Sequence, residues 1–256
     1  MTVAPFVALV LPLAYAILRR YSPRDTSVEV VPEDARYLPY GVSLAIMWTI
    51  GLGIAIGGYF GLRGVNHLFA SMDRGSTLVL YPTAILWCFA PGFAALCLPW
   101  LTTLWMLRRT GYTGEAQEIV IDGNDKMNWN GERVMRWACL GIVAPIFLFT
   151  LAALPMRLSM DNNSVRVTHY AHLTPEIFPL ADARHAFTVD GYLLRDGTLQ
   201  SRPDLLIDFA DGRRLAATAM SDGGDPPPQA FVDALLSHTG LHLTHVRTEH
   251  DIPNGQ

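Results

Sequence analysis

The sequence is poor in charged residues. Only 16% of the 256 residues are Asp, Glu, Lys or Arg, against roughly 25% in an ordinary soluble domain. The deficit falls almost entirely before Arg157, and no charged residue lies between Gly75 and Leu107. Hydrocarbon excludes charge strongly, and about 20 apolar residues are enough for a helix to cross a bilayer. The run from Gly75 to Leu107 therefore predicts a membrane span with length to spare.

Cysteine and basic runs are also scarce. The three cysteines, Cys88, Cys97 and Cys139, all lie inside apolar runs, where they are better interpreted as small hydrophobic residues than as a disulfide framework or a metal cage. The formal net charge is −4 and no long basic run is present. We therefore expect no nucleic-acid partner.

Catalytic signatures are missing as well. The sequence contains no glycine-rich phosphate loop, no His-Glu-x-x-His helix and no Gly-x-Ser-x-Gly elbow. None of the expected spans holds an internal ionisable residue of the kind that proton-coupled transporters usually need. The sequence therefore nominates no catalytic residue and no cofactor, and we expect a protein that is not an enzyme.

Four apolar segments predict a membrane domain over residues 1–157 with three or four transmembrane helices, at about residues 1–18, 37–62, 78–107 and 137–156. Arg19-Arg20 follow the first segment, so an uncleaved span fits better than a signal peptide, with a re-entrant or interfacial segment as the alternative. In the third, prolines and a Pro91-Gly92 pair predict a kinked helix. Arg157 ends the fourth, where its side chain can reach the lipid headgroups.

The connections between these segments differ in character. Residues 63–76 place Val65, Leu68, Phe69 and Met72 at helical spacing, which predicts an amphipathic turn along the membrane surface. Residues 110–135 are polar. Within them, 118–122, 123–125 and 126–130 predict a strand, a turn and a second strand.

Three glycines recur at a spacing of four in the second segment. Gly53, Gly57 and Gly61 share one helix face, and small residues on one face let two membrane helices approach closely. Either this face packs within the chain's own bundle, or it forms a seam between two copies in a homo-oligomer.

Positive charge in the short loops predicts the orientation. The loops at 19–36 and 108–136 are richer in Lys and Arg than the loop at 63–76. This pattern places the richer loops in the cytoplasm and everything after Met156 outside. The expected location is a bacterial inner (plasma) membrane, with the C-terminal domain on the periplasmic or extracytoplasmic side.

The sequence pattern of residues 158–256 predicts a small, β-rich soluble domain with a flexible C-terminal end. Strands are predicted at 164–170 and 176–180. The clearest hairpin joins 205–209 to 214–220 through the turn at 210–213. A helix follows from Pro226 to about His238, ended by Gly240, and 241–246 is a candidate further strand. The fold class is therefore α+β.

Part of this domain resembles a known family. The Pro-Leu-Ala-Asp-Ala-Arg turn (Pro179 to Arg184), the Phe-Ala-Asp-Gly-Arg-Arg hairpin (Phe209 to Arg214) and the terminal helix resemble bacterial PH-like domains, over about residues 160–245. The resemblance implies a small sandwich of strands capped by a helix, which is found fused to membrane helices and which binds partners or lipids. The sequence lacks the basic cluster of a phosphoinositide pocket.

Two groups of side chains in this domain suggest chemistry. His238, His242 and His245 could offer imidazoles to Zn²⁺ or Cu²⁺. Their spacing matches no structural zinc pattern, so we interpret them as a surface scatter and expect no metal. Arg213-Arg214 could meet a phosphate group, and a solvated strand end explains them equally well.

These observations predict an integral membrane protein whose PH-like domain is non-catalytic and binds a protein partner, or acts as a scaffold, beside the lipid bilayer. The alternative is a channel or permease component that uses the kinked span at 78–107, because discontinuous helices line substrate sites in transporters.

Overall fold

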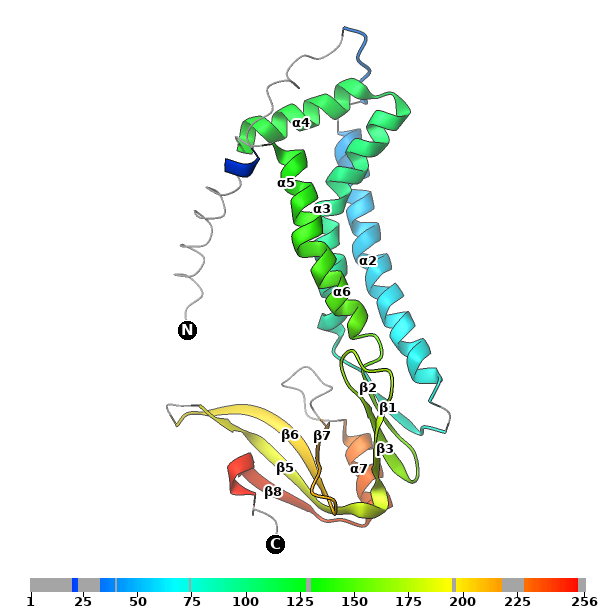
Figure 1. The fold of residues 1–256 in the computed structure, drawn as a ribbon, viewed down its shortest axis with the longest axis vertical. Helices are drawn as coiled ribbons and strands as arrows, with labels where there is room; N and C mark the ends of the chain where they lie inside the picture. The colour runs from blue at the N-terminus through cyan, green and yellow to red at the C-terminus, as the bar shows by residue number, and fades with distance from the viewer. Residues whose placement is uncertain are drawn as a thin grey trace. The chain divides into compact units, whose positions relative to one another are not determined.

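The computed structural model describes residues 20–22, 33–39, 41–73, 75–127, 130–194, 197–217 and 228–252 (Figure 1). The chain divides into two compact units. The helical unit comprises Met1–Tyr59 and Cys88–Leu148, and the sheet unit comprises Phe60–Trp87 and Phe149–Gln256. Long apolar helices and two four-stranded sheets confirm the α+β fold class.

Three helical stretches are long and apolar enough to cross a bilayer. They are α2 (Val42–Ser71), α3 (Ala84–Thr110) and the run Gly131–Ala152. The run combines α5 (Gly131–Ala138), the π-helix η2 (Cys139–Val143) and α6 (Ala144–Ala152). The expected segment at residues 1–18 lies outside the described residues.

Helix α2 extends further than the sequence predicts. The amphipathic turn expected at residues 63–76 is wrong in its first part, because the helix continues unbroken through Val65, Leu68 and Phe69 to Ser71. Helical spacing of apolar residues is the same pattern whether a helix begins or continues. The apolar spacing alone therefore does not show whether residues 63–71 form a separate helix or the end of α2.

In the helical unit, α2 and α3 approach closely where glycine meets proline. A Cβ added at Gly58 would lie 2.9 Å from the ring of Pro91, and one added at Gly51 would lie 3.3 Å from Pro99 Cγ. The two prolines therefore fill the space that the glycines leave. Helix α3 runs without interruption from Ala84 to Thr110, with Pro91 and Pro99 inside it.

The three glycines at a spacing of four make no such close contact. A Cβ added at Gly53, Gly57 or Gly61 would meet nothing within 4 Å. Within the described residues, therefore, this face of α2 is not used for packing against the chain's own helices.

The hairpin predicted within residues 110–135 is wrong, because this stretch contains helix α4 (Thr113–Met127). Ala116 and Val120 are buried in a cluster with Leu104 and Leu107 of α3. The three β-branched residues between Glu118 and Asp122 also suit a strand, but burial at positions i and i+4 stabilises the helix instead.

The strands of the sheet unit form two sheets. The first has the order β1-β2-β3-β4, all antiparallel, with β1 (Leu78–Leu80), β2 (Arg157–Met160), β3 (Ser164–Thr168) and β4 (Glu176–Pro179). The second has the order β7-β6-β5-β8, with β5 (Ala183–Leu193), β6 (Leu199–Phe209), β7 (Arg214–Ala216) and β8 (Leu243–Thr248). Strand β8 pairs in parallel with β5, and the short helix η3 (Leu180–Asp182) leads from the first sheet into the second.

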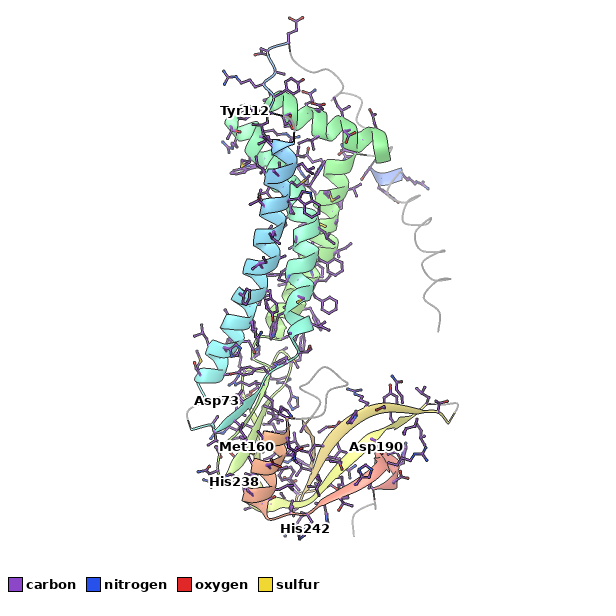
Figure 2. The ribbon with its side chains drawn as sticks, turned by 180° about the vertical axis from the view of Figure 1, so that it is seen from behind. Asp73, Tyr112, Met160, Asp190, His238 and His242 are labelled. Carbon is purple, nitrogen blue, oxygen red and sulfur yellow. The ribbon has the colours of Figure 1, made fainter. Side chains whose placement is uncertain are left out.

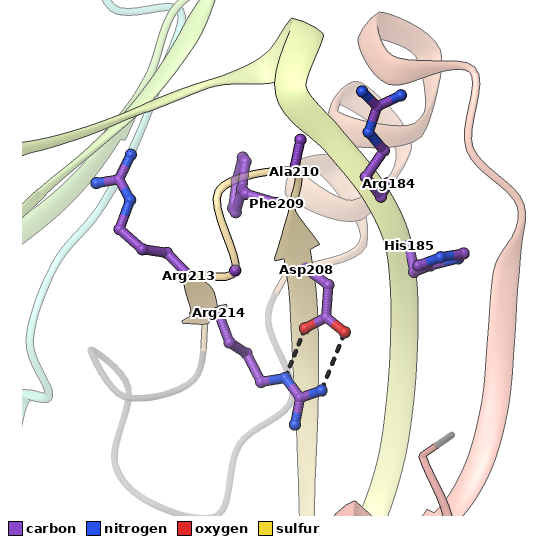
Figure 3. A pocket seen from close by; sticks show the side chains of 8 residues that line it. Arg184, His185, Asp208, Phe209, Ala210, Arg213 and Arg214 are labelled. Carbon is purple, nitrogen blue, oxygen red and sulfur yellow. Dashed lines mark hydrogen bonds and ion pairs between the residues drawn. The ribbon is translucent and has the colours of Figure 1, made fainter. Parts of the chain in front are cut away.

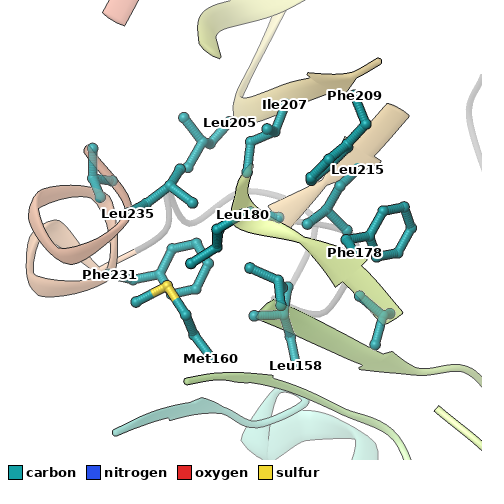
Figure 4. Close-up of a cluster of buried hydrophobic side chains, with 14 residues drawn as sticks. Leu158, Met160, Phe178, Leu180, Leu205, Ile207, Phe209, Leu215, Phe231 and Leu235 are labelled. Atoms are coloured by element: carbon teal, nitrogen blue, oxygen red, sulfur yellow. The ribbon is translucent and has the colours of Figure 1, made fainter. Parts of the chain in front are cut away.

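The two sheets share one hydrophobic core (Figure 4). Met160 and Leu158 come from the first sheet, Leu205 and Ile207 from the second, and all four are fully buried. Helix α7 (Gln229–Thr239) covers this core with Phe231 and Leu235. It ends at Gly240, whose φ of 66° is the left-handed conformation that favours glycine. The predicted end of this helix is confirmed.

Strand β1 corrects the start of the span predicted at 78–107, because Leu78–Leu80 form a strand and helix α3 begins only at Ala84. They pair with Met160, Ser159 and Leu158 of β2. Pro82 follows the strand, and the Thr83 hydroxyl accepts a hydrogen bond from Ile85 N–H at the start of α3. The sheet unit is thus built from two distant parts of the chain.

A buried ion pair links these two parts. Arg157 donates to the carboxylate of Asp73 at 2.6 and 2.8 Å, and the Ser159 hydroxyl donates to Asp73 at 3.0 Å. The side chains of Arg157 and Asp73 are only 7% and 10% exposed. The expectation that Arg157 reaches lipid headgroups is therefore wrong. Figure 2 labels Asp73 just after α2.

A buried amide on α2 makes a further contact in this unit. Asn66 is fully buried, and its Nδ2 donates to the carbonyls of Leu154 and Met156 at 2.7 and 3.1 Å. These carbonyls lie in the connection between α6 and β2, and backbone acceptors that are removed from water need a hydrogen-bond partner. Asn66 therefore caps the connection from α6 to β2.

Candidate functional site

A cleft of about 710 Å³ lies beside the hairpin that joins β6 to β7 (Figure 3). The turn is closed by hydrogen bonds from Phe209 N–H to the Arg213 carbonyl and from Gly212 N–H to the Phe209 carbonyl, both 3.0 Å. Gly212 has a φ of 82°, a conformation that side chains rarely adopt. The predicted hairpin is confirmed through Ala216, where β7 ends, and residues 218–220 of the predicted second strand lie outside the described residues. The hairpin places two successive arginines in the lining of the cleft.

Arg213 is held by four groups. It donates to Asp211 at 2.6 Å, to Glu176 at 3.1 Å and to the carbonyl of Ile177 at 3.2 Å. Its guanidinium also lies 4.5 Å from the ring centroid of Phe178, a favourable cation–π distance. Arg213 therefore ties the β6–β7 turn to β4.

Arg214 forms a bidentate ion pair with Asp208 of the neighbouring strand β6. Its Nε and Nη2 donate to the two oxygens of Asp208 at 2.5 and 3.0 Å, and Glu249 adds a weaker contact at 3.4 Å. Figure 3 shows Arg214 reaching Asp208 while Arg213 extends away from it. The charge of Arg214 is thus largely matched within the domain.

Arg184 enters the cleft from β5 through an irregularity in the sheet. Ala183 pairs with Phe209 and His185 pairs with Asp208, which leaves Arg184 as an extra residue in a bulge. Bulges redirect side chains and are common beside functional sites. Arg184 is exposed, and within the described part of the chain it has no ion-pair or hydrogen-bond partner.

The pKa shifts in the cleft follow from this pairing. The backbone N–H and guanidinium of Arg213 both donate to Asp211 and hold the pKa of that carboxyl below its usual value. The Asp208 carboxylate raises the pKa of Arg214 in turn. Asp211 and Asp208 therefore match the charges of Arg213 and Arg214 within the domain, whereas Arg184 has no such partner among the described residues.

The lining favours recognition of an anion. It contains three guanidinium groups, one imidazole from His185 and one carboxylate from Asp208. Guanidinium groups bind carboxylate and phosphate oxygens in a planar, directional way. Arg213-Arg214 do lie at the candidate site, but neighbouring carboxylates already occupy them, so they shape the cleft and Arg184 presents the available charge.

The three histidines considered for a metal do not come together. His238 contacts Ala234 and Asn162, and His245 contacts Thr188 and Asp190. Figure 2 labels His238 and His242 at different places on the domain. No group of three or more metal-ligating side chains occurs among the described residues.

Sequence reasoning missed the special position of Arg184. It belongs to the Pro179–Arg184 turn that carries the family resemblance, but nothing in the sequence marks the bulge, because register depends on pairing with Phe209 and Asp208. Comparison of the chain with family models, curated proteins and solved structures finds no match.

Proposed function

We propose that this chain is an integral membrane protein of a bacterial inner membrane, and that its sheet unit is a non-catalytic PH-like domain that binds a protein partner beside the bilayer. Three helices with the length and composition of membrane spans support the first part. Large apolar side chains on them are exposed, among them Trp48 at 73% and Leu96 at 74%. A lipid environment would cover these side chains.

The PH-like assignment is supported by the shared core of two sheets covered by α7. Strand β8 overlaps the further strand expected at 241–246; it follows the helix and extends the second sheet. The expected periplasmic position of the domain remains part of the proposal. Alkaline-phosphatase and green-fluorescent-protein fusions at Gln256 test it, and a bright cytoplasmic fluorescent fusion would reject it.

The observation that carries the binding role is Arg184, an exposed guanidinium placed by a bulge in a cleft whose other arginines are already paired. An unmatched charge in a concave surface fits an acidic side chain on a protein partner. Removing such a charge should weaken binding, and reversing it should abolish binding.

The test compares Arg184→Glu with Arg184→Lys and with Arg202→Glu in the full-length protein, after crosslinking in the native membrane and affinity purification. Arg202 is a matched control, because it is an exposed arginine of β6 outside the cleft lining. Arg184→Glu should lose the crosslinked partner, while the other two variants keep it. Identical partner profiles for Arg184→Glu and the unmodified protein would reject this role for the cleft.

Point variants are needed because the sheet unit cannot be removed cleanly. Deleting residues 158–256 would leave β1 without the strand that it pairs with and would remove the remainder of the shared core. Loss of a partner in such a deletion would then report unfolding as readily as loss of the cleft.

A homo-oligomer through Gly53, Gly57 and Gly61 is a second proposal, supported by the open face that these glycines form. Gly57→Leu should abolish a dimer measured by light scattering in detergent, because a bulky side chain keeps two helices apart. Ile56→Ala, at an exposed neighbour on α2, is the control. A dimer that survives Gly57→Leu would exclude this face.

A further inference from the structure

The loop between β3 and β4, residues 169–175, lies against the end of helix α6. Ala171 N–H donates to the carbonyl of Ala152 at 2.8 Å, and the Tyr170 hydroxyl donates to the carbonyl of Phe149 at 3.1 Å. The rings of Tyr170 and Phe149 are 4.9 Å apart. All these residues belong to the sheet unit. The loop is therefore tied to the last turn of a candidate membrane span.

The composition of this loop is unusual for a surface loop of a soluble domain. No Asp, Glu, Lys or Arg lies between Arg166 and Glu176. Leu173, near its centre, is 75% exposed, more than any other large hydrophobic side chain in the described ranges. The next most exposed, Leu96 and Trp48, both lie on candidate spans. Leu173 is thus exposed to the degree expected of a side chain that faces lipid.

The backbone of the loop is held in a costly conformation. Ala171 has a φ of 59°, and among the described residues it is the single non-glycine with a positive φ. Side chains disfavour this region, and it persists where surrounding contacts fix it. Here the hydrogen bond to Ala152 fixes Ala171, which lies between Tyr170, packed against Phe149, and the exposed Leu173.

A second tyrosine occupies a comparable place in the sheet unit. Tyr81 precedes the start of α3 and lies 4.1 Å, ring to ring, from His67 of α2. Tyrosine is enriched where membrane meets water, because its ring is apolar and its hydroxyl is polar. Tyr81 before α3 and Tyr170 against the last turn of α6 therefore lie beside the ends of two candidate spans, at positions typical of the interface.

We propose that the β3–β4 loop is a bilayer contact, in which Tyr170 lies among the lipid headgroups and the side chain of Leu173 enters the outer part of the acyl chains. The loop would give the sheet unit a point of attachment to the membrane besides its covalent connections to the helices. The proposal rests on membrane insertion of the candidate spans, but not on partner binding through the cleft.

The test uses single cysteines labelled with an environment-sensitive fluorophore in the full-length chain, with Cys88, Cys97 and Cys139 replaced by alanine. The protein is reconstituted into phosphatidylcholine vesicles that contain brominated lipids, which quench fluorophores in the bilayer. Leu173→Cys is the test position. Leu148→Cys, at an exposed position of α6, is the lipid control, and His242→Cys, exposed after α7, is the water control.

We expect the label at position 173 to show blue-shifted emission. Lipids brominated near the headgroup should quench most of its fluorescence. The label at 242 should respond to aqueous iodide and not to bromine. Quenching at 148 with a water-like response at 173 would overturn the loop contact while leaving the spans in place. A water-like response at all three positions would overturn membrane insertion, and the loop contact with it.

Discussion

Replacing Asp73 by alanine should free β1 from the first sheet. The change removes the acceptor of both guanidinium bonds from Arg157 and of the Ser159 hydroxyl, and it leaves an arginine that is 7% exposed without a counter-charge. Breaking a buried ion pair by removing one partner costs about 3–5 kcal/mol. Because each 1.4 kcal/mol is a factor of ten, the opening equilibrium of β1 should rise by about 10²- to 10⁴-fold.

Hydrogen exchange of the full-length protein measures this opening directly, through the amides of residues 77–80 and 157–160. The double variant Asp73→Leu/Arg157→Met should recover most of the lost protection, because apolar replacement of a whole buried pair is often neutral. Asp211→Asn, which disrupts an exposed pair on the β6–β7 turn, should leave these amides unchanged. Undiminished protection of β1 in Asp73→Ala would refute the reasoning.

The same pair predicts a dependence on pH. The hydrogen bond from Arg157 is the largest influence on Asp73 and lowers its pKa in the folded protein, against an opposing effect of burial. A lowered folded pKa adds stability that is complete above the unfolded value of about 3.9 and is lost as the pH falls through the folded value. Pepsin should therefore cleave near β1 faster as the pH drops below about 4. Asp73→Asn should lose this added dependence.

Three glycine substitutions give predictions of opposite sign, each measured by thermal unfolding of the full chain in detergent. Gly58→Ala should destabilise the protein by about 1–3 kcal/mol, since the new methyl group would press on the rigid ring of Pro91. Gly92→Ala, in open space on α3, should instead stabilise it by about 0.5–1 kcal/mol; equal shifts for these two variants would contradict the glycine–proline contact. Gly191→Ala should destabilise the β5–β6 hairpin by about 1–3 kcal/mol, because its Cβ would overlap the Gln200 carbonyl, and unchanged exchange of the hairpin amides would refute this.

The elements that sequence predicts well are those with local signals. The β6–β7 hairpin has a glycine that its turn requires, and α7 has an apolar face and a terminal Gly240. Leu78–Leu80 have no such signal, because three apolar residues of a strand have the same composition as the membrane helix that follows. Helix α4 cannot be told from a strand in the sequence, because Ile119 to Ile121 fit the periodicity of either. Burial against α3 decides in favour of the helix.

In the sheet unit too, the sequence marks residues beside a local signal and does not mark those that long-range pairing places. Arg213-Arg214 stand out in the sequence because they follow a turn. Asp73 and Arg157 are far apart in the chain and have no local pattern that joins them. Arg184 acquires its exposed position from a register shift, which exists only once β5 and β6 have paired.

The pairing of β1 with β2 also imposes a rule of parity on the membrane topology. Two hydrogen-bonded strands must lie on the same side of a bilayer, so the chain between Leu80 and Arg157 must cross it an even number of times. The candidate spans Ala84–Thr110 and Gly131–Ala152 would together provide two crossings, an even number. If α3 folded back instead of crossing, one crossing would remain and the strands would be separated. A single three-residue strand thereby constrains the path of the 76 residues that follow it.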